Sequence, residues 1–460
     1  MLQQVLTHWN ALQTYRQERL RCKNYTYGRQ YLDKVSYGAR EMTEEEYIRS
    51  EGNVPLKNNL IRRIVRNVLG VFRNSLVLPT SVEQLGLDSG NPDHHILAGR
   101  ISDAVKRDNL HELYCRLMEE YLIGGLVAVR KNRVPVHTGG FQTQDSGSVI
   151  VTTDIVRPDS FFFNTDSNDP RGTDVTVVGE IHTVKSEEAV ARFAASPEDA
   201  ERILAYSGHG VDERFTTEES TVRIIELWRR ELRHRWLCHD RKSGRMYYAD
   251  SKPSADTDAI WRCEYVWRYY FLAPDGTVLK EGDSPYGEAC HPYVFKAYPF
   301  IDGEIHSFVA DCIDQQRYIN RLITLNDWIL RSSAKGVLIF PEGSLPEDVD
   351  LPEITDQWAR YNGVISYRHQ DGVPPPHQES SKATNIGVSE LLAVQLKMME
   401  DVSGVNSALQ GQLTNGAVSG TLYGMQTQQA LTGLADIIKG YESFIADSFR
   451  KDCRMLGQAA

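Results

Sequence analysis

The stretch "EIHSFVADCIDQQRYINRLITLNDWILRSSA", Glu304–Ala334, contains neither proline nor glycine. Apolar residues keep one side of it hydrophobic: Phe308, Cys312, Ile319, Ile323 and Leu330. At about 1.5 Å per residue, such a helix would reach about 45 Å, longer than an ordinary domain helix. One unusually long helix with an apolar side is therefore expected here.

Upstream of this stretch, helical patterns give way to strand patterns. Helices are expected over residues 1–24, 43–74 (with a break at 52–55), 96–123 and 185–206, where Ser186 is the expected N-cap. The pair Gly124–Gly125 should form a tight turn, followed by strands within 126–132, 148–156 and 160–164. Residues 221–300 are rich in aromatic and β-branched residues and predict an antiparallel β module with hairpins.

Downstream, a strand and a turn are expected within 335–348 and another strand over 362–370, followed by a polar loop over 371–387. Helices are expected over 388–402 and 435–456, the second with an apolar stripe of Ile437, Tyr441, Phe444, Ile445 and Phe449. The uncharged segment between them, Ser403–Leu434, should contain an ordered turn over 403–420 and the start of a helix over 421–431. The predicted fold class is α+β, with helices at both ends and an inserted antiparallel β module.

Composition limits the possible classes of protein. A chain of 460 residues is expected to form two or three structural units. The net charge of −11 argues against a general nucleic-acid-binding face. Seven scattered cysteines without a C-x-x-C pair indicate a reducing compartment. The sequence shows neither a signal peptide nor an apolar run of membrane-spanning length.

Signals for catalysis are weak. The sequence has no phosphate-binding glycine motif and no nucleophile or metalloprotease motif. "NTDSNDPRG", Asn164–Gly172, resembles a calcium loop, but Asp169 replaces the required glycine and Val175 the final glutamate. No catalytic residue, metal ligand or cofactor is therefore predicted. The acids within 164–174 remain the candidate ligands of an alternative, a metal-dependent nucleic-acid hydrolase.

Two arginine clusters allow two interpretations each. Arg62, Arg63, Arg66 and Arg73 form either a solvated basic face or a contact to a subunit or DNA. The strip 221–238 either turns its arginines outward and its aromatic residues inward, or forms a tip that contacts phosphate or a partner.

The order of these segments resembles that of tailed-bacteriophage portal proteins, in a style closest to the portals of short-tailed phages. Three stretches carry the resemblance: "NNLIRRIVRNVLGVFRN", the long helix, and "VSGVNSALQGQLTNGAVSGTLYGMQTQQA". The polar rhythm of the long helix comes from Asp311, Asp314, Gln315, Arg317 and Asn320. The third stretch carries Ser-Gly-Val-Asn at 403–406, then Gly411, Ser419, Gly420 and the glutamines 426, 428 and 429.

This resemblance implies a non-enzymatic ring, expected to be a dodecamer, at one capsid vertex of the virion, formed in the host cytoplasm. Double-stranded DNA would pass through its channel. The implied partners are the terminase large subunit, the tail adaptor, and the major capsid and scaffolding proteins, with no membrane. The implied parts are an N-terminal wing (1–180), a first stem segment (181–220), a β-rich clip (221–303), a stem helix (304–335), and a C-terminal wing (336–460) with a tunnel-like loop (373–387) and a short or absent crown.

The resemblance also assigns candidate site residues. The stem set is Asp314, Gln315, Arg317, Asn320, Arg321 and Arg331. The tunnel-loop set is Gln378, Ser380, Ser381, Lys382, Thr384 and Asn385. The clip set, for partner contact, is Arg229, Arg230, Arg233, Arg235 and Trp236. The subunit-interface set is Ser403, Asn406, Ser419, Gln426 and Gln429. A non-portal virion scaffold or minor capsid protein is the other alternative.

Overall fold

The chain divides into two compact units that are interleaved in sequence. Unit 1 comprises residues 1–27, 61–311 and 403–460, and unit 2 comprises 28–60 and 312–402. The computed structural model describes residues 1–38, 40–135, 149–207, 221–240, 244–249, 251, 257–286, 290–335, 337–341, 343–346, 349–359, 364–369, 371–379, 387–405 and 420–457. Side chains within 331–335 and 420–431 are outside this description, as are those of Thr257, Val337 and Ala359.

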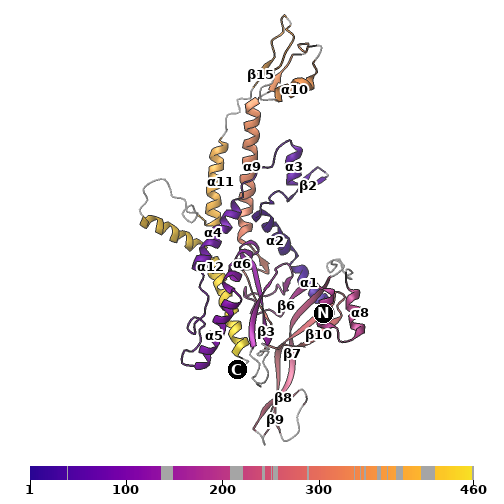
Figure 1. Ribbon diagram of the computed structural model, residues 1–460, viewed down its shortest axis with the longest axis vertical. Coiled ribbons are helices and arrows are strands. Elements are labelled where there is room, and N and C mark those ends of the chain that lie inside the picture. Colours follow the sequence, from indigo (N-terminus) through magenta and orange to yellow (C-terminus); the bar gives the residue numbers. More distant parts are fainter. Residues whose placement is uncertain are drawn as a thin grey trace. The chain divides into compact units, whose positions relative to one another are not determined.

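Unit 1 combines helices with antiparallel sheets, which confirms the α+β class (Figure 1). Its helices are α1 (Leu2–Ala11), α2 (Gln13–Thr26), α4 (Leu60–Ser75, from Ile61 on), α5 (Pro92–Arg107), α6 (Leu110–Gly124), α7 (Ser186–Phe193), α8 (Pro197–Ala205) and α12 (Gly420–Gly457). Its strands are β3 (Leu126–Pro135), β4 (Val149–Val156), β5 (Phe161–Phe163), β6 (Val177–Lys185), β7 (Thr221–Asp240), β8 (Met246–Ala249), β9 (Thr257–Leu272), β10 (Val278–Asp283), β11 (Tyr293–Ala297), β12 (Phe300–Ile301) and β13 (Glu304–Ile305).

The strands of unit 1 form two main sheets. One has the order β10-β9-β7-β6-β5, with β8 added to the distal end of β7, and the other has the order β11-β3-β4. The first part of β7 pairs with β6 from Thr221 to Arg229, and β7 pairs with β9 from Ile225 to Asp240. The β-rich region expected over 221–300 is therefore continuous with a preceding strand. Its last strand, β11, belongs to the other sheet.

Aromatic side chains of α6 and α12 fill the core beside the three-stranded sheet. Helix α12 packs against α5, α6 and strands β3, β4 and β11 (Figure 1). The buried ring of Tyr441 lies 5.2 Å from Phe72 and 5.4 Å from Tyr121, and its hydroxyl donates to the carbonyl of Tyr114 at 2.6 Å. Of the apolar stripe predicted for 435–456, Tyr441, Phe444, Ile445 and Phe449 are buried and Ile437 is half-buried.

Gly125 makes the turn between α6 and β3 that the sequence predicts. Its φ of +70° is left-handed, and its N–H donates to the carbonyl of Tyr121 at 2.7 Å. A Cβ atom at this position would lie 1.9 Å from the carbonyl oxygen of His306. Only glycine meets both requirements without strain.

Unit 2 is built on the long helix. Most of α9 (Phe308–Lys335) belongs to it, together with β1 (Lys34–Tyr37), β2 (Arg40–Thr43), α3 (Glu44–Ser50), β14 (Val337–Ile339), α10 (Leu351–Ala359), β15 (His377–Glu379) and most of α11 (Val388–Ser403). Strands β1 and β2 form a hairpin, and β14 pairs antiparallel with β15. The predicted long helix is confirmed, starting four residues later than expected because Glu304–Ile305 forms β13.

Several predicted elements were wrong in detail. The helix expected over 96–123 is two helices, because Asn109 adopts a left-handed φ of 46° between α5 and α6. The helix expected over 185–206 breaks before Pro197, where Ser196 caps α8. Ser186 is the first residue of α7 rather than its N-cap, and its hydroxyl bonds to Ser207.

The region after α9 also differs from the prediction. A strand was expected over 362–370, but its described residues, 364–369, form none. Helix α10 was not predicted, and β15 lies inside the expected loop. Within the described ranges, no helix has the length and hydropathy needed to cross a membrane.

Candidate functional site

Buried amide side chains tie residues 30–60 to α9 within unit 2. Gln316, Asn320 and Gln30 are 0–1% exposed. The Gln316 amide donates to the carbonyl of Asn58 at 2.7 Å and to Asn320 Oδ1 at 2.9 Å, and Gln316 Oε1 accepts from the N–H of Leu60 at 3.0 Å. Asn320 in turn donates to Gln30 at 2.7 Å. This amide network satisfies backbone groups of an irregular segment, which is why such polar residues can be buried.

The network changes the interpretation of Asn320. The spacing of polar residues in the sequence placed Asn320 on the polar side of α9, but its side chain is buried inside unit 2. Gln316, the most connected member, was not predicted, because neither spacing nor composition distinguishes a buried amide from an exposed one.

Replacing Gln316 with alanine should loosen the 28–60 segment. The N–H of Leu60 and the carbonyl of Asn58 would lose their partner, which costs about 1–3 kcal/mol. If the segment opens locally, trypsin cleavage at Lys34 and Arg40 should accelerate about 5- to 150-fold. Time-resolved proteolysis with mass spectrometry measures this rate. The matched control is Gln315→Ala, because the buried Oε1 of Gln315 accepts no hydrogen bond in the described structure; equal acceleration by both variants would contradict the proposed role of Gln316.

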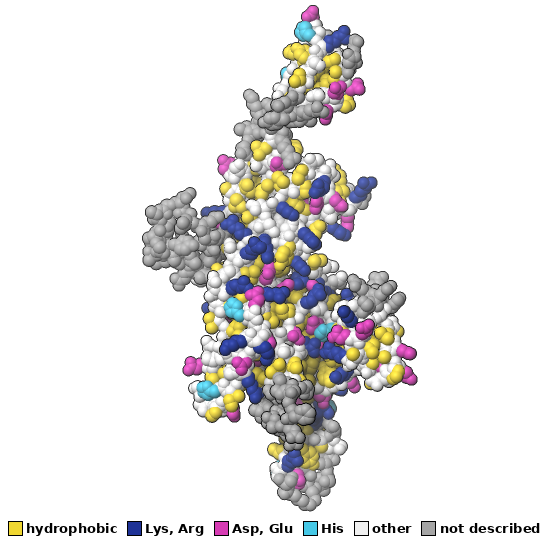
Figure 2. All heavy atoms as spheres, in the orientation of Figure 1, with side chains coloured by type: hydrophobic (Ala, Val, Ile, Leu, Met, Phe, Trp, Pro, Cys, Tyr) yellow, Lys and Arg dark blue, Asp and Glu magenta, His cyan; other side chains and the backbone are white. Residues whose placement is uncertain are grey.

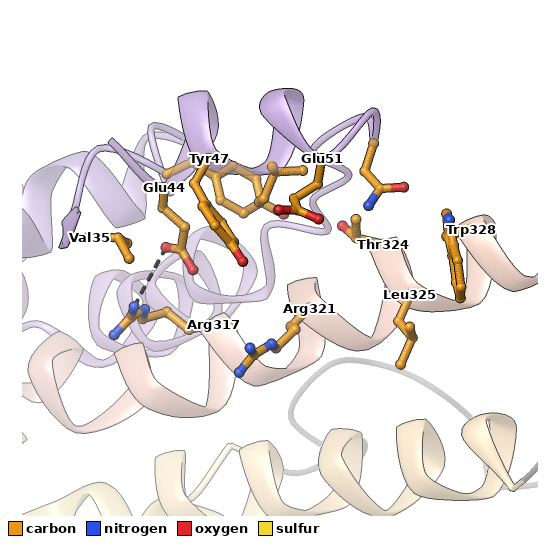
Figure 3. A pocket seen from close by; sticks show the side chains of 12 residues that line it. Val35, Glu44, Tyr47, Glu51, Arg317, Arg321, Thr324, Leu325 and Trp328 are labelled. Carbon is orange, nitrogen blue, oxygen red and sulfur yellow. Dashed lines mark ion pairs between the residues drawn. The ribbon is translucent and has the colours of Figure 1, made fainter. Parts of the chain in front are cut away.

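The remaining stem candidates divide by environment. Asp314 and Arg321 are exposed and Gln315 is half-buried. Arg317 faces two acids of the same unit, Asp33 at 3.8 Å and Glu44 at 3.6 Å. Figure 3 shows the pair with Glu44. Arg321 forms no ion pair with any described residue. Arg331 belongs to α9, but its side chain is outside the described part.

Two arginines of α4 connect helices of unit 1. Arg62 pairs with Glu119 and Arg73 pairs with Glu112, both acids of α6. Arg62 is half-buried and bridges α4 and α6, so the interpretation as a solvated basic face does not describe it. Arg73 is 54% exposed, so it remains on a solvated face while it pairs with α6.

The distal hairpin of β7 and β9 presents two different faces. The register pairs Leu232 with Tyr265 and Trp236 with Trp261, so these residues share one face of the hairpin. Leu232, Trp261 and Tyr265 are 50–57% exposed. We call Leu232, His234, Trp236, Trp261 and Tyr265 the aromatic face. In Figure 2, hydrophobic side chains reach the surface at the lower end of the view, where Figure 1 places this hairpin.

The opposite face of the hairpin carries arginines, most of which are paired with acids. Arg229 pairs with Glu231, and both Arg233 and Arg235 approach Asp283. Arg268 approaches the same acids, at 3.7 Å from Glu231 and 3.3 Å from Asp283. Of the predicted clip set, Arg230 alone among the arginines shares the aromatic face, where its guanidinium lies 4.8 Å from the centre of the Tyr265 ring.

This arrangement combines features of both interpretations of strip 221–238. Arginines do gather on one face, but the aromatic residues of the distal hairpin are exposed rather than turned inward. Exposed tryptophan and tyrosine beside arginine form the composition typical of protein-binding hot spots.

A buried carboxylate fixes the base of this hairpin. Glu226 is 0% exposed and accepts from Arg130 of β3 at 2.8 Å, His182 of β6 at 2.8 Å and the Trp228 indole at 2.7 Å. Burial opposes its charge, but hydrogen bonding from His182 and the charge of Arg130 outweigh that effect and lower the pKa of Glu226. Glu226 therefore stays ionised and connects the two main sheets.

The acidic loop 164–174 uses its oxygens on its own backbone and side chains. Asp174 accepts from the hydroxyl of Ser167 at 2.6 Å and from the N–H of Asn168 at 2.7 Å. Asn164 Oδ1 accepts from the N–H groups of Thr176 and Val177. Among described residues, no group of three or more His, Cys, Asp or Glu side chains is arranged to hold a metal.

The remaining predicted residues have separate positions. Gln378 lies in β15 opposite Leu338. Ser403 is 2% exposed, and its hydroxyl accepts from the N–H of Val405. Gln426 and Gln429 belong to α12, which begins at Gly420, but their side chains are outside the description. The others lie outside the described residues altogether: Ser380, Ser381, Lys382, Thr384, Asn385, Asn406 and Ser419.

Comparison with known protein families gives a match over nearly the whole chain. The sequence model of one family, described as "Phage P22-like portal protein", matches residues 2–458. No curated protein matches the chain. Since the family match extends over both units and all segments described above, the chain belongs to the phage P22-like portal protein family.

Proposed function

We propose that copies of this chain form a dodecameric ring at one capsid vertex, through which double-stranded DNA enters during packaging and leaves during ejection. The observation that carries this proposal is the family match over residues 2–458. Portal proteins are structural components, so ATP hydrolysis would belong to the terminase and not to this chain. The stem role of 181–220 and 304–335, and the approach of loop 373–387 to DNA, are part of the proposal.

The charge of the chain supports a conduit. A net charge of −11 per copy disfavours tight phosphate binding, because neutralisation by Lys and Arg supplies most non-specific affinity for DNA. The described exposed residues of α9 include Asp311, Asp314 and only one unpaired arginine, Arg321. Sparse basic groups would let DNA slide.

The aromatic face of the β7–β9 hairpin supports a docking role. In the proposal this hairpin belongs to the clip and binds the terminase large subunit and later the tail adaptor. The major capsid and scaffolding proteins would contact the wing parts of the ring. On the opposite face Arg229, Arg233 and Arg235 are paired with acids, which leaves Arg262 as an exposed arginine without an ion pair among the described residues of that face.

Negative-stain electron microscopy of the purified protein tests the ring. Closed rings with a central hole are expected. Monomers or open filaments at every concentration would contradict the proposal.

Deleting 376–386 separates a portal from a scaffold or minor capsid protein. The deletion variant should still form rings but should lose DNA packaging in an in vitro assay with terminase and empty capsids. Retention of full packaging would remove the tunnel-loop role.

A further inference from the structure

Helix α11 carries an exposed apolar stripe. Its exposed apolar residues recur at i, i+3, i+7 and i+11, so they share one side of the helix. They are 39–48% exposed: Leu391, Val394, Met398 and Val402. Gln395 and Met399, by contrast, are buried. We call these four exposed residues the α11 stripe; a face of this kind is normally covered by another element.

A groove in unit 2 has complementary chemistry. It lies between α9 and the segment of β1 and α3, and its volume is about 540 Å³. Figure 3 shows Arg321, Leu325 and Trp328 along one wall and Tyr47 and Glu51 on the other. Leu325 and Trp328 are 41% and 50% exposed. The groove is therefore partly apolar and open to a partner.

We propose that the α11 stripe of one copy packs into the α3–α9 groove of a second copy. This inference rests on the proposed ring and names a contact that holds it together. Both surfaces lie on the same unit and are exposed in the same chain, so the stripe does not fill its own groove. A contact between two different surfaces of identical copies is head-to-tail, which is the type of interface that closes into a ring.

The two surfaces match in length and direction. The stripe covers residues 391–402 and the α9 wall covers 317–328, which at about 1.5 Å per residue makes each about 16 Å long. Figures 1 and 3 show α11 beside α9, and in Figure 1 it runs in the opposite direction. Neighbours in a twelve-membered ring differ by a rotation of about 30° (360°/12), which leaves the neighbour's α11 roughly antiparallel to α9.

Charge at the rims also fits. Arg321 on the groove wall is exposed and has no ion pair in the described structure. Asp401 and Glu390 flank the stripe on one side of α11, and both are exposed and likewise unpaired among described residues. The exposed Lys397 lies on the same side, so two acids and one base leave this rim with a net negative charge. In the antiparallel arrangement Asp401 lies near Arg321 and Leu391 lies near Trp328. A rim of opposite charges around an apolar contact favours correct docking.

Cysteine cross-linking tests the position and direction of the contact. In a Cys263→Ser background, which removes the exposed native cysteine, Trp328→Cys combined with Leu391→Cys should give a ladder of cross-linked copies with a bismaleimide. The parallel pair, Trp328→Cys with Val402→Cys, should give at least about tenfold less product. A cross-linked dimer from Leu391→Cys alone would show stripe-to-stripe contact and overturn the proposal.

A matched pair of substitutions tests the energetics. Val394→Asp places a carboxylate in the stripe, whereas Leu396→Asp makes the same kind of change at an exposed position on the other side of α11. In sedimentation experiments, Val394→Asp should weaken assembly at least about tenfold and Leu396→Asp should not. Because both positions are exposed, both variants should keep the wild-type circular dichroism spectrum. The proposed contact would be overturned if Val394→Asp formed rings of normal stability and no cross-link formed between positions 328 and 391; the ring itself would remain established. If the unmodified protein formed no rings, the proposed function would be removed instead.

Discussion

Replacing Lys131 with methionine should lower the melting temperature of the protein by roughly 4–7 °C. Lys131, on β3, is 0% exposed and donates to Asp452 of α12 at 2.7 Å and to Thr153 at 2.8 Å. Burial would lower the pKa of Lys131, but the charge of Asp452 outweighs this effect and raises it, so the lysine is charged. Removing one partner of a buried ion pair costs about 3–5 kcal/mol, because the other charge stays buried and unpaired.

Two control variants show whether the change in melting temperature comes from the broken ion pair or only from the loss of a positive charge. Lys106 of α5 is exposed, and Lys106→Met should leave the melting temperature within about 1 °C of wild type. Combining Lys131→Met with Asp452→Leu should recover most of the loss, because well-packed apolar residues replace buried ion pairs at little cost. A Lys131→Met protein that melts like Lys106→Met would contradict the role of this pair. Since Asp452 lies on α12, the pair helps to dock the C-terminal helix on the sheet.

Such long-range pairs mark the limit of prediction from this sequence. The strand containing Lys131 was predicted from its β-branched residues, but its partner lies 321 residues later. A lysine in a strand is usually exposed. Nothing local to either residue distinguishes a buried lysine, so its burial could not be predicted.

Elements with strong periodicity were predicted well. The long helix, the strands from β3 to β5 and the C-terminal helix follow directly from apolar spacing, because tertiary burial selects one face of each. The errors lie where a single residue sets the conformation. Asn109, with its left-handed φ, divides one expected helix into two, and Asn tolerates that conformation without being required to adopt it.

The sequence predicted which types of residue strip 221–238 offers to a partner, but not how these residues are arranged in space. The sequence identified both arginine and aromatic residues in strip 221–238. Only the pairing of β7 with β9 shows which of them share a face, since a shift of one residue would exchange the faces. The acids Glu231 and Asp283 that neutralise the arginines come from different strands. The aromatic face is consequently the stronger candidate for partner binding.

Alanine at Trp261 or Tyr265 should weaken binding of the terminase large subunit at least about 30-fold, the effect of a hot-spot residue worth about 2 kcal/mol. Both side chains are more than half exposed in the chain, so each can bury a large apolar area against a partner. Calorimetric titration of assembled rings with the terminase subunit measures the change.

Tyr248→Ala is the matched control, because Tyr248 is 48% exposed on β8 and its partner in β7, Leu237, lies on the arginine face. It removes the same side chain from the other side of the same hairpin and should change binding less than about threefold. Equal losses from Tyr248→Ala and Tyr265→Ala would contradict a face-specific contact. All three variants should form normal rings, because these residues belong to neither the α11 stripe nor the α3–α9 groove. A defect in binding with intact rings therefore isolates docking from assembly.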